Sequence, residues 1–593
     1  MKQFFKTMFA SMFGFILAQI IFIIIGVIIM AAFIGSIVGS AGDETKNKIS
    51  ENSILKIELN TPINDRSSNN PFEGFDFGTF ESNKPLGLNT ILRALEHAKL
   101  DKKIKGIYLN LESVPAGMAT MEEIREALVD FKTSGKFIVA YSEVYTQKAY
   151  YLASVADKMY MNPAGDMELK GLSTSLMFFK NTLEKLEVEP EIIRHGKFKS
   201  AVEPFMYDKM SAENRKQTMS FVGTIWNNML TGIGQSRKIS IEELNSIATN
   251  LSITNAEDAV KLKLIDKLSY YDEIETELKN RVGLVAGADL NFVSLKKYSQ
   301  HVEQNKQFAK DKIAVIYASG EIQSGDSDDG AMGSETIAEA IKDARLDSKI
   351  KAIVLRVNSP GGSALASDVM WREVILAKKV KPVIVSMGDV AASGGYYISC
   401  AADKIFADKN TITGSIGVFG LMFNAKAMLN NKLGLTFDTV MTNKHADMGS
   451  IYRPLTNEER NFMQMSVERV YKDFITKVGE GRKMDIAQVD SVGQGRVWSG
   501  VDAKNIGLID EFGGLNAAIM EAAKMAKLSK YKITELPKQK EPFEKLMEDF
   551  QTEAQANFLK TNFGVASDYI TKLEQFINAK GIQARMPFEL EIY

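Results

Sequence analysis

An internal duplication constrains the fold of this chain more than any other feature of its sequence. Residues 90–109 (TILRALEHAKLDKKIKGIYL) are matched by residues 336–355 (TIAEAIKDARLDSKIKAIVL), about 246 residues further along the chain. A match over this length predicts two similar domains in tandem. Two further pairs of segments continue the match: residues 150–152 with 396–398, and residues 264–266 with 508–510.

Each copy alternates short β-rich runs with amphipathic helical stretches. Such alternation is typical of an α/β domain with a mostly parallel sheet and right-handed crossover helices. We therefore predict the α/β fold class, with two tandem domains of this kind. The β-rich runs are residues 54–59, 107–111 and 137–140 in the first copy and residues 313–317, 353–357 and 382–386 in the second.

The two copies meet near residues 298–311, a polar stretch without apolar periodicity. After Pro537 the chain is charged, and from residue 541 to about residue 573 its apolar positions fall at helical spacing. We expect this tail to be a packing or assembly element. The predicted parts are a membrane anchor at residues 1–45, a first repeat at 46–300, a second repeat at 301–536 and a C-terminal helical tail at 537–593.

The N-terminus carries the clearest signal for the compartment. Lys2 and Lys6 precede an apolar run over residues 8–38, which is long enough to span a bilayer, and Asp43 and Glu44 follow it. By the positive-inside rule the N-terminus faces the cytoplasm and the rest of the chain lies across the membrane. The alternative, a cleaved signal peptide, leaves the body in the same compartment.

Composition excludes some classes of function. The 72 Lys and Arg against 74 Asp and Glu give a formal net charge of −2, so there is no basic field for nucleic acid. The single cysteine, Cys400, lies in an apolar run and cannot form an internal disulfide. We predict neither a metal site nor a cofactor.

Two segments of the second copy could carry chemistry. A strand ending at Val357 runs into residues 358–363 (NSPGGS), where Gly361 and Gly362 expose backbone N–H groups that can bind an oxyanion, although a plain turn has the same sequence. A second strand leads into Ser393, which small residues surround at the expected start of a helix. That place suits a nucleophile, but it also suits an ordinary helix cap.

Comparison of the two copies favours the chemical interpretation. Residues 147–149 (QKA) are the counterpart of residues 393–395 (SGG), and Ala116 and Gly117 are the counterpart of the paired glycines. A cap or turn that the fold needed would be expected in both copies. The serine and the paired glycines occur in the second copy alone, which indicates that this copy is specialised for chemistry.

A nucleophilic serine needs a base, and histidine is the usual one. The chain has four histidines, at positions 97, 195, 301 and 445. A triad that uses His195 or His445 stays open, although neither lies in a convincing local signature.

The other option is a lysine whose pKa burial has lowered. The candidate segment is residues 194–205 (RHGKFKSAVEPF), which contains Lys197 and Lys199. One alignment of the copies places Lys199 opposite Ala446, and a shift of two residues places it opposite Lys444. Under the first alignment one copy keeps the base and the other keeps the nucleophile. Two solvated surface lysines are the ordinary alternative.

These residues resemble signal peptide peptidase A, also called protease IV, in its long, duplicated form. This is peptidase family S49, of the ClpP/crotonase-like fold group, and the resemblance covers nearly the whole chain. Its most specific segments are residues 196–205 (GKFKSAVEPF), 358–362 (NSPGG), 391–396 (AASGGY), 413–418 (TGSIGV) and 495–498 (GRVW).

The resemblance implies roles for individual residues. Lys199 is implied to be the general base and Ser393 the nucleophile of a Ser/Lys dyad. Gly361 is implied to supply an oxyanion N–H, with Gly362 in the same loop, and Ser415 is implied to hold the lysine amine by a hydrogen bond. The choice of Lys199 over Lys197 rests on the family pattern.

The resemblance also implies a substrate and a setting. The expected activity is hydrolysis of apolar peptides, chiefly signal peptides left in the membrane after preprotein cleavage. The expected form is a ring-like homotetramer on the periplasmic side of the bacterial inner membrane. Two other classes stay open: a crotonase-like hydratase or isomerase that acts on acyl thioesters, and a non-catalytic membrane scaffold.

Overall fold

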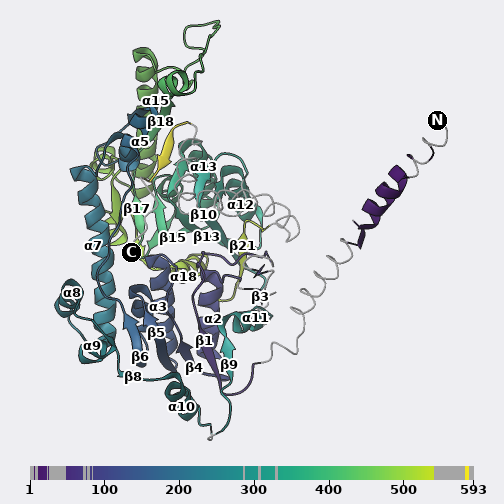
Figure 1. Ribbon diagram of the computed structural model, residues 1–593, viewed down its shortest axis with the longest axis vertical. Coiled ribbons are helices and arrows are strands. Elements are labelled where there is room, and N and C mark those ends of the chain that lie inside the picture. The colour runs from purple at the N-terminus through teal and green to yellow at the C-terminus, as the bar shows by residue number, and fades with distance from the viewer. Residues whose placement is uncertain are drawn as a thin grey trace.

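The computed structural model describes a body built from two stacked halves (Figure 1). In the N-terminal region residues 11–22 are helical, while most of the predicted anchor and the predicted helical tail at 541–573 lie outside the described residues. No helix that the structure describes combines the length and the apolar character needed to cross a bilayer. The described residues are 6, 8, 11–22, 24–25, 49–70, 75–76, 81–82, 84–284, 287–304, 309–326, 331–539 and 581–586.

The first half contains a six-stranded sheet in the order β8-β6-β5-β4-β1-β9, in which every neighbouring pair is parallel. Its elements are β1 (Ser53–Ile57), β2 (Phe75–Asp76), β3 (Glu81–Ser82), α2 (Leu88–Leu100), β4 (Ile104–Leu109), α3 (Met118–Lys132), β5 (Phe137–Tyr145), α4 (Gln147–Ala153), β6 (Lys158–Met167), α5 (Lys180–Leu186), β7 (Glu189–Arg194), the 3-10 helix η2 (Ser200–Val202), α6 (Glu203–Met206), α7 (Ala212–Arg237), α8 (Ile241–Thr249), α9 (Ala256–Lys261), β8 (Lys267–Leu268), α10 (Tyr271–Arg281), β9 (Phe292–Ser294) and α11 (Leu295–Gln304).

The second half contains an eight-stranded sheet with the path β19-β17-β15-β13-β10-β21, to which β16 and β20 are joined beside β15. Its elements are β10 (Lys312–Ser319), β11 (Glu321–Gln323), β12 (Ala331–Gly333), α12 (Ser334–Leu346), β13 (Ile350–Ser359), β14 (Gly361–Ser363), α13 (Ala364–Lys378), β15 (Val383–Ala392), α14 (Gly394–Ser399), β16 (Lys404–Ala407), β17 (Ile412–Gly414), β18 (Phe419–Asn424), the π-helix η3 (Met428–Lys432), α15 (Asn457–Arg482), α16 (Ile486–Val492), β19 (Val497–Ser499), α17 (Gly500–Asn505), β20 (Glu511–Phe512), α18 (Leu515–Met525), β21 (Lys532–Leu536) and β22 (Gln583–Arg585).

The strand orders confirm the duplication. The order β9-β1-β4-β5-β6-β8 in the first sheet is repeated as β21-β10-β13-β15-β16-β20 in the second. Equivalent tyrosines make equivalent bonds: the Tyr150 hydroxyl donates to the Leu264 carbonyl oxygen at 3.0 Å, and the Tyr396 hydroxyl donates to that of Leu508 at 2.8 Å. The predicted α/β class with mostly parallel sheets is therefore confirmed.

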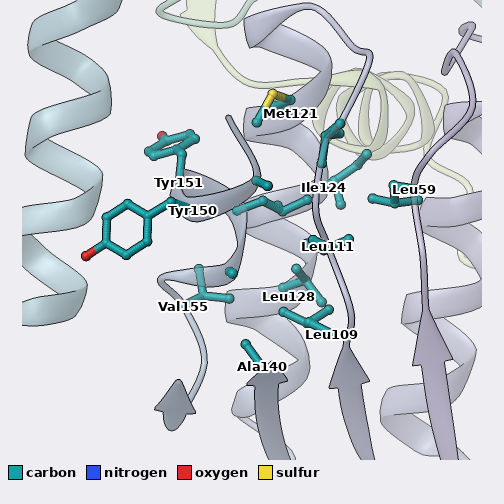
Figure 2. Packing of buried hydrophobic residues seen from close by; sticks show 14 of the residues in the cluster. Leu59, Leu109, Leu111, Met121, Ile124, Leu128, Ala140, Tyr150, Tyr151 and Val155 are labelled. Carbon is teal, nitrogen blue, oxygen red and sulfur yellow. The ribbon is translucent and has the colours of Figure 1, made fainter. Parts of the chain in front are cut away.

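Each half has its own core against its main sheet. In the first half Leu128 of α3 lies beside Leu109 (Figure 2), and Met121, Ile124 and Ala140 belong to the same buried cluster. In the second half α12 and α13 cover one face of the sheet and α18 covers the other. The beta-branched and small residues of these strands suit burial on both faces.

A third sheet joins the halves, in the order β12-β11-β14-β22-β18-β7. Strand β7 comes from the first half and pairs antiparallel with β18 of the second. Strand β22, from the C-terminal region, lies between β14 and β18 and is antiparallel to both. This sheet places the Lys199 segment, which follows β7, beside the second half.

Two sequence-based expectations need correction. The stretch near residue 300 is not without periodicity, because Leu295, Tyr298 and Val302 lie on one face of helix α11 and are buried. Its many polar residues hid this narrow apolar stripe. The C-terminal region at 537–593 is not wholly helical either, since residues 583–585 form strand β22.

Candidate functional site

Ser393 lies on a sharp turn between the end of β15 and the start of α14. Its backbone has φ 55° and ψ −110°, a conformation that favours glycine and costs another residue about 1–3 kcal/mol. Ser393 occupies the N-cap position, yet its side chain makes no capping hydrogen bond. The hydroxyl therefore does not serve the helix, which argues against the interpretation of this serine as an ordinary cap.

Lys199 lies directly before η2 in the first half, and its side chain reaches the second half. Its Nζ lies 2.9 Å from Ser393 Oγ, 3.2 Å from Ser415 Oγ and 3.4 Å from the Ser415 carbonyl oxygen. Lys199, Ser393 and Ser415 are each 0% exposed. The structure thus brings three of the predicted site residues together, and it draws them from both halves.

Glycines of the second half make room for the lysine. A Cβ added at Gly495, where φ is 81°, would lie 2.6 Å from Lys199 Cα, and one added at Gly417 would lie 3.3 Å from Lys199 Cδ. Lys197 is exposed. These contacts distinguish Lys199 from Lys197 as the lysine that reaches Ser393.

The hydrogen bonds around the amine define its role. Burial lowers the pKa of the Lys199 amine well below its ordinary value. The Ser415 hydroxyl donates to the Gly495 carbonyl oxygen at 3.3 Å, so toward Lys199 it can only accept, as can the Ser415 carbonyl oxygen. These two acceptors take both N–H groups of a neutral amine. The lone pair of the neutral amine is then available to the Ser393 hydroxyl, whose single proton can turn from the Gly417 carbonyl oxygen at 3.3 Å to the amine at 2.9 Å.

This arrangement predicts a pH dependence. Acylation of Ser393 should become faster as the pH rises through one ionisation well below ~10.4, because only the neutral amine accepts a proton. Folding should also become more favourable between that lowered pKa and about 10.4, because there the unfolded chain binds the extra proton. Labelling rates with a serine-directed acylating probe, measured across pH, check the first expectation.

The matched control for the pH profile is Lys197→Ala, which removes an exposed lysine two residues away and should leave the profile unchanged. A labelling rate that stays constant across the same pH range in the wild type would count against the amine as the base.

Gly361 begins the short strand β14 and has φ 97°. A Cβ at this position would lie 2.1 Å from the carbonyl oxygen of Ala584 and 2.7 Å from the backbone nitrogen of Gly394. The N–H of Gly361 donates to Ser359 Oγ at 3.1 Å. A side chain at position 361 would collide with the Ala584 carbonyl oxygen and with the backbone of Gly394. This position therefore requires glycine.

Strand β22 shows how an extended peptide fits beside this loop. Gly362 is in register with Ala584, and a Cβ at Gly394 would lie 3.1 Å from the Ala584 carbonyl oxygen. Arg585 Nη1 lies 2.7 Å from Glu321 Oε1 of β11, in the same sheet. The space between β14 and β18 is thus one strand wide, and a backbone carbonyl within it faces the glycines.

The other candidate bases lie elsewhere. His195 and His445 hydrogen-bond glutamates of α15, at 2.7 Å and 3.1 Å. Lys444 pairs with Glu458 and is exposed. Within the described part of the chain the Ser393 hydroxyl bonds the lysine amine and the Gly417 carbonyl oxygen, the latter at 3.3 Å.

The first half has ordinary structure at the equivalent turn. Thr146 caps α4 with φ −65°, and its side chain accepts from the Ala149 N–H. Gln147, the counterpart of the serine, uses its side chain to bond the backbone of Lys170 and Gly171. The strained turn is therefore confined to one copy.

Sequence reasoning missed several contributors. Ser359 accepts the Gly361 N–H, and Gly495 leaves room for the lysine. Both lie inside the family-like segments at 358–362 and 495–498, where their small size could have indicated a role. Strand β22 had no local signal. Among the residues described, no group of three His, Cys, Asp or Glu side chains could hold a metal ion.

A serine hydroxyl on a strained strand-to-helix turn, bonded to a buried lysine amine, is an arrangement of serine hydrolases. The family model described as Peptidase family S49 matches residues 130–285 and again residues 375–529. The chain belongs to Peptidase family S49, and it is a serine peptidase.

Named relatives agree with this assignment. The chain is 40% identical over 450 residues to "Protease 4" of Salmonella typhi, a match that covers 74% of this chain and 72% of the relative. It is 37% identical over 450 residues to "Protease 4" of Haemophilus influenzae, with coverages of 73% and 72%. It is 34% identical over 546 residues to "Serine protease SPPA, chloroplastic" of Arabidopsis thaliana, with coverages of 91% and 78%.

One solved structure, a point mutant of ClpP1 from Listeria monocytogenes, matches with 16% identity and a TM-score of 0.24. The match covers 35% of this chain and 94% of that one. A likeness at this score is too low to support an inference about the fold.

Proposed function

We propose that this serine peptidase uses Ser393 as its nucleophile and Lys199 as its general base, and that it hydrolyses apolar peptides, chiefly signal peptides left in the membrane. The observation that carries the proposal is the 2.9 Å contact between Lys199 Nζ and Ser393 Oγ in a fully buried site. A neutral amine in such a site is a base strong enough to activate a serine hydroxyl.

The reaction follows from that contact. The amine takes the hydroxyl proton of Ser393, and the oxygen bonds to the carbonyl carbon of the peptide. The C–N bond then breaks, and the ammonium gives its proton to the departing amine. Water next gives a proton to the neutral Lys199 amine and attacks the acyl carbon. The ester C–O bond to Ser393 Oγ then breaks and the acid leaves, while the Lys199 ammonium returns its proton to Oγ and restores the hydroxyl.

Backbone N–H groups of the glycine loop are proposed to bind the oxyanion. The close approach of the Ala584 carbonyl oxygen to Gly361 and Gly394 supports this role. Because the Gly361 N–H is bonded to Ser359 Oγ in this conformation, we include Gly362 and the N-terminus of α14 in the donor set.

The substrate is proposed to bind as a strand between β14 and β18, in the place that β22 occupies in this structure. Ile322 is in register with Gly362 on one side, and Phe419 is in register with Gln583 on the other. Both apolar side chains are buried, at 1% and 2% exposed. An extended apolar peptide would continue these contacts.

The setting is part of the proposal. The apolar run at residues 8–38, with Lys2 and Lys6 before it, supports a single N-terminal anchor whose N-terminus faces the cytoplasm. The catalytic body would then lie on the periplasmic side of a bacterial inner membrane, beside peptides that remain in the bilayer.

We also propose that the protein is a homo-oligomer of four copies. The segment before α15, which projects from the body at the top of Figure 1, supports an oligomer. Large exposed apolar groups on one segment mark an interaction surface. The exposed apolar side chains there are Leu433, Leu435, Phe437, Val440, Met441, Met448 and Ile451, joined by Phe462 and Met465 of α15.

We also propose the ClpP/crotonase-like fold group, supported by the parallel sheets and by the donor loop between β13 and α13.

The test uses the full chain in phospholipid vesicles with an apolar signal peptide as substrate. A matched peptide with two core leucines changed to serine should be hydrolysed at least ~10-fold more slowly, because burying one leucine is worth about 1.5–3 kcal/mol. Ser393→Ala gives the background rate. Equal rates for the two peptides would overturn the substrate class.

Membership of Peptidase family S49 decides against the two other classes, the crotonase-like enzyme and the non-catalytic scaffold. Absence of Ser393 labelling in the active full chain would overturn the proposed nucleophile.

A further inference from the structure

The loop that carries Lys199 is hydrogen-bonded to one side chain of α7, that of Gln217. The Gln217 Nε2 donates to Ser200 Oγ at 2.8 Å and lies 3.3 Å from the Phe198 carbonyl oxygen. These two residues flank Lys199 directly. Gln217 is 1% exposed, so its amide is committed to protein partners.

The other end of the same amide contacts the second half. Gln217 Oε1 accepts from the backbone N–H of Val497 at 3.1 Å, where β19 begins. The preceding residue, Arg496, accepts the Ser415 N–H at its carbonyl oxygen, at 2.7 Å. Because a backbone N–H can only donate, the orientation of the amide is determined. One amide therefore links the Lys199 loop to the segment that holds Ser415.

Buried neighbours hold Gln217 in one conformation. Its Nε2 lies 3.2 Å from Asn214 Oδ1, and Asn214 Nδ2 donates to Glu203 Oε2 at 2.9 Å. Glu203 also accepts from the N–H and the hydroxyl of Ser211, at 3.2 Å and 2.6 Å. Asn214 and Glu203 are 0% and 1% exposed. A buried network whose members are satisfied fixes its side chains.

The duplicated fold supplies an internal comparison. Helices α7 and α15 each have 26 residues and begin directly after the caps Ser211 and Thr456. The sixth residue after the cap is Gln217 in α7 and Phe462 in α15, where it is 57% exposed. The repeat therefore does not require a buried amide at this position. The amide occurs in the copy that carries Lys199.

We propose that Gln217 is a positioning residue: its amide holds the residues on both sides of Lys199 against β19, through the Phe198 carbonyl oxygen and the Ser200 hydroxyl, so that the amine meets Ser393 when the two halves are docked. This inference rests on the catalytic roles proposed above for Lys199 and Ser393. A loop released from Gln217 would move away from β19 and admit water to the amine. A displacement of about 1 Å can cost on the order of 10²-fold in rate.

Charged groups lie near the loop, and Lys197 within it is exposed. Glu203 lies on α6, Arg194 Nη1 of β7 lies 3.5 Å from the Lys199 carbonyl oxygen, and the Arg496 guanidinium lies 5.2 Å from the centroid of the Phe198 ring. The amine itself bonds the two serines instead. A change in the pH midpoint of acylation therefore reports the surroundings of the amine.

The experiment compares Gln217→Met and Gln217→Ala with the wild type, in the full chain and in vesicles. Asn228→Ala is the matched control, because Asn228 lies on the same helix and its Nδ2 bonds Asn410 of the second half at 2.9 Å, away from the loop. Rates are divided by the number of Ser393 sites that an acylating probe labels exhaustively, so unfolded protein does not count.

The expected result for both Gln217 variants is a kcat lowered by about 10- to 100-fold with KM within ~3-fold. The pH midpoint of acylation should rise by about one unit, because water at the amine relieves the burial that favours its neutral form. Asn228→Ala should keep the wild-type midpoint. A wild-type midpoint in both Gln217 variants, whatever their kcat, would overturn the positioning role.

The failure of the proposed function has a different signature. If Lys199→Ala leaves the wild-type rate and pH profile intact, then the dyad fails. If Lys199→Ala is inactive but the Gln217 variants match the wild type, then only the positioning role fails.

Discussion

Replacement of Lys199 by methionine is expected to lower kcat by on the order of 10³-fold or more, and Ser393→Ala is expected to do the same. Methionine has nearly the length of the lysine stem, so it can lie against Gly417 and Gly495 without an amine. The loss of rate then reports proton transfer and not a cavity. Peptide hydrolysis and probe labelling, measured on each purified variant, give the two rates.

The same Lys199→Met change is expected to leave the stability equal or raise it, by on the order of 1 kcal/mol. An amine held at 0% exposure costs solvation that a thioether does not. Lys197→Ala, at an exposed position, should match the wild type in both activity and stability. Full activity in Lys199→Met, or a loss of activity that merely follows unfolding, would remove Lys199 from the mechanism.

The duplication made the fold readable from the sequence. The expected strands at residues 107–111 and 353–357 correspond to β4 and β13, which occupy equivalent places in two sheets of the same order. The local sequence is enough to predict such strands, since the strands of a parallel sheet buried on both faces are continuous apolar runs. The short strands that complete the third sheet gave no such signal.

The proposed catalytic serine could be predicted from the sequence for a different reason. Ser393 and its counterpart Gln147 fall in matching turns, so the strained serine could be recognised as an addition to the repeat. Lys199 could not be chosen over Lys197 on spacing alone. What distinguishes the two is burial against Gly417 and Gly495, which lie more than two hundred residues away in the chain.

Contacts between the halves account for what the sequence could not indicate. Gln217 bonds Val497, and Asp389 accepts the N–H groups of Ala119 and Thr120 at 2.8 Å and 3.1 Å, at the N-terminus of α3. Each residue sits in an unremarkable local pattern. The contacts between Gln217 and Val497, and between Asp389 and α3, exist only because one copy docks on the other.

Arg356 is a further contact of this kind, and it joins the halves through buried charge. From β13 its Nε lies 2.7 Å from Asp65 Oδ1, and its Nη2 lies 2.7 Å from Glu123 Oε1, both of the first half. The three side chains are 0%, 3% and 4% exposed. Arg356 Nη1 also donates to Ser386 Oγ at 2.9 Å. Removal of the guanidinium would leave two carboxylates buried without their cation.

Arg356→Met is therefore expected to lower the free energy of unfolding by on the order of 3–5 kcal/mol. Denaturant unfolding followed by circular dichroism measures the change. Arg345→Met is the matched control within the second half, because Arg345 pairs with Glu373 at 3.2 Å while 21% exposed. That change should cost less than about 1 kcal/mol.

The Arg356 variant should also separate activity from secondary structure. Since Lys199 and Ser393 come from different halves, undocking would part them while each half keeps its helices, so activity should fall at a lower denaturant concentration than the circular dichroism signal. Adding Asp65→Asn and Glu123→Gln should recover part of the loss, because neutral amides bury no uncompensated charge. Wild-type midpoints for both signals in Arg356→Met would mean that this cluster does not hold the halves together.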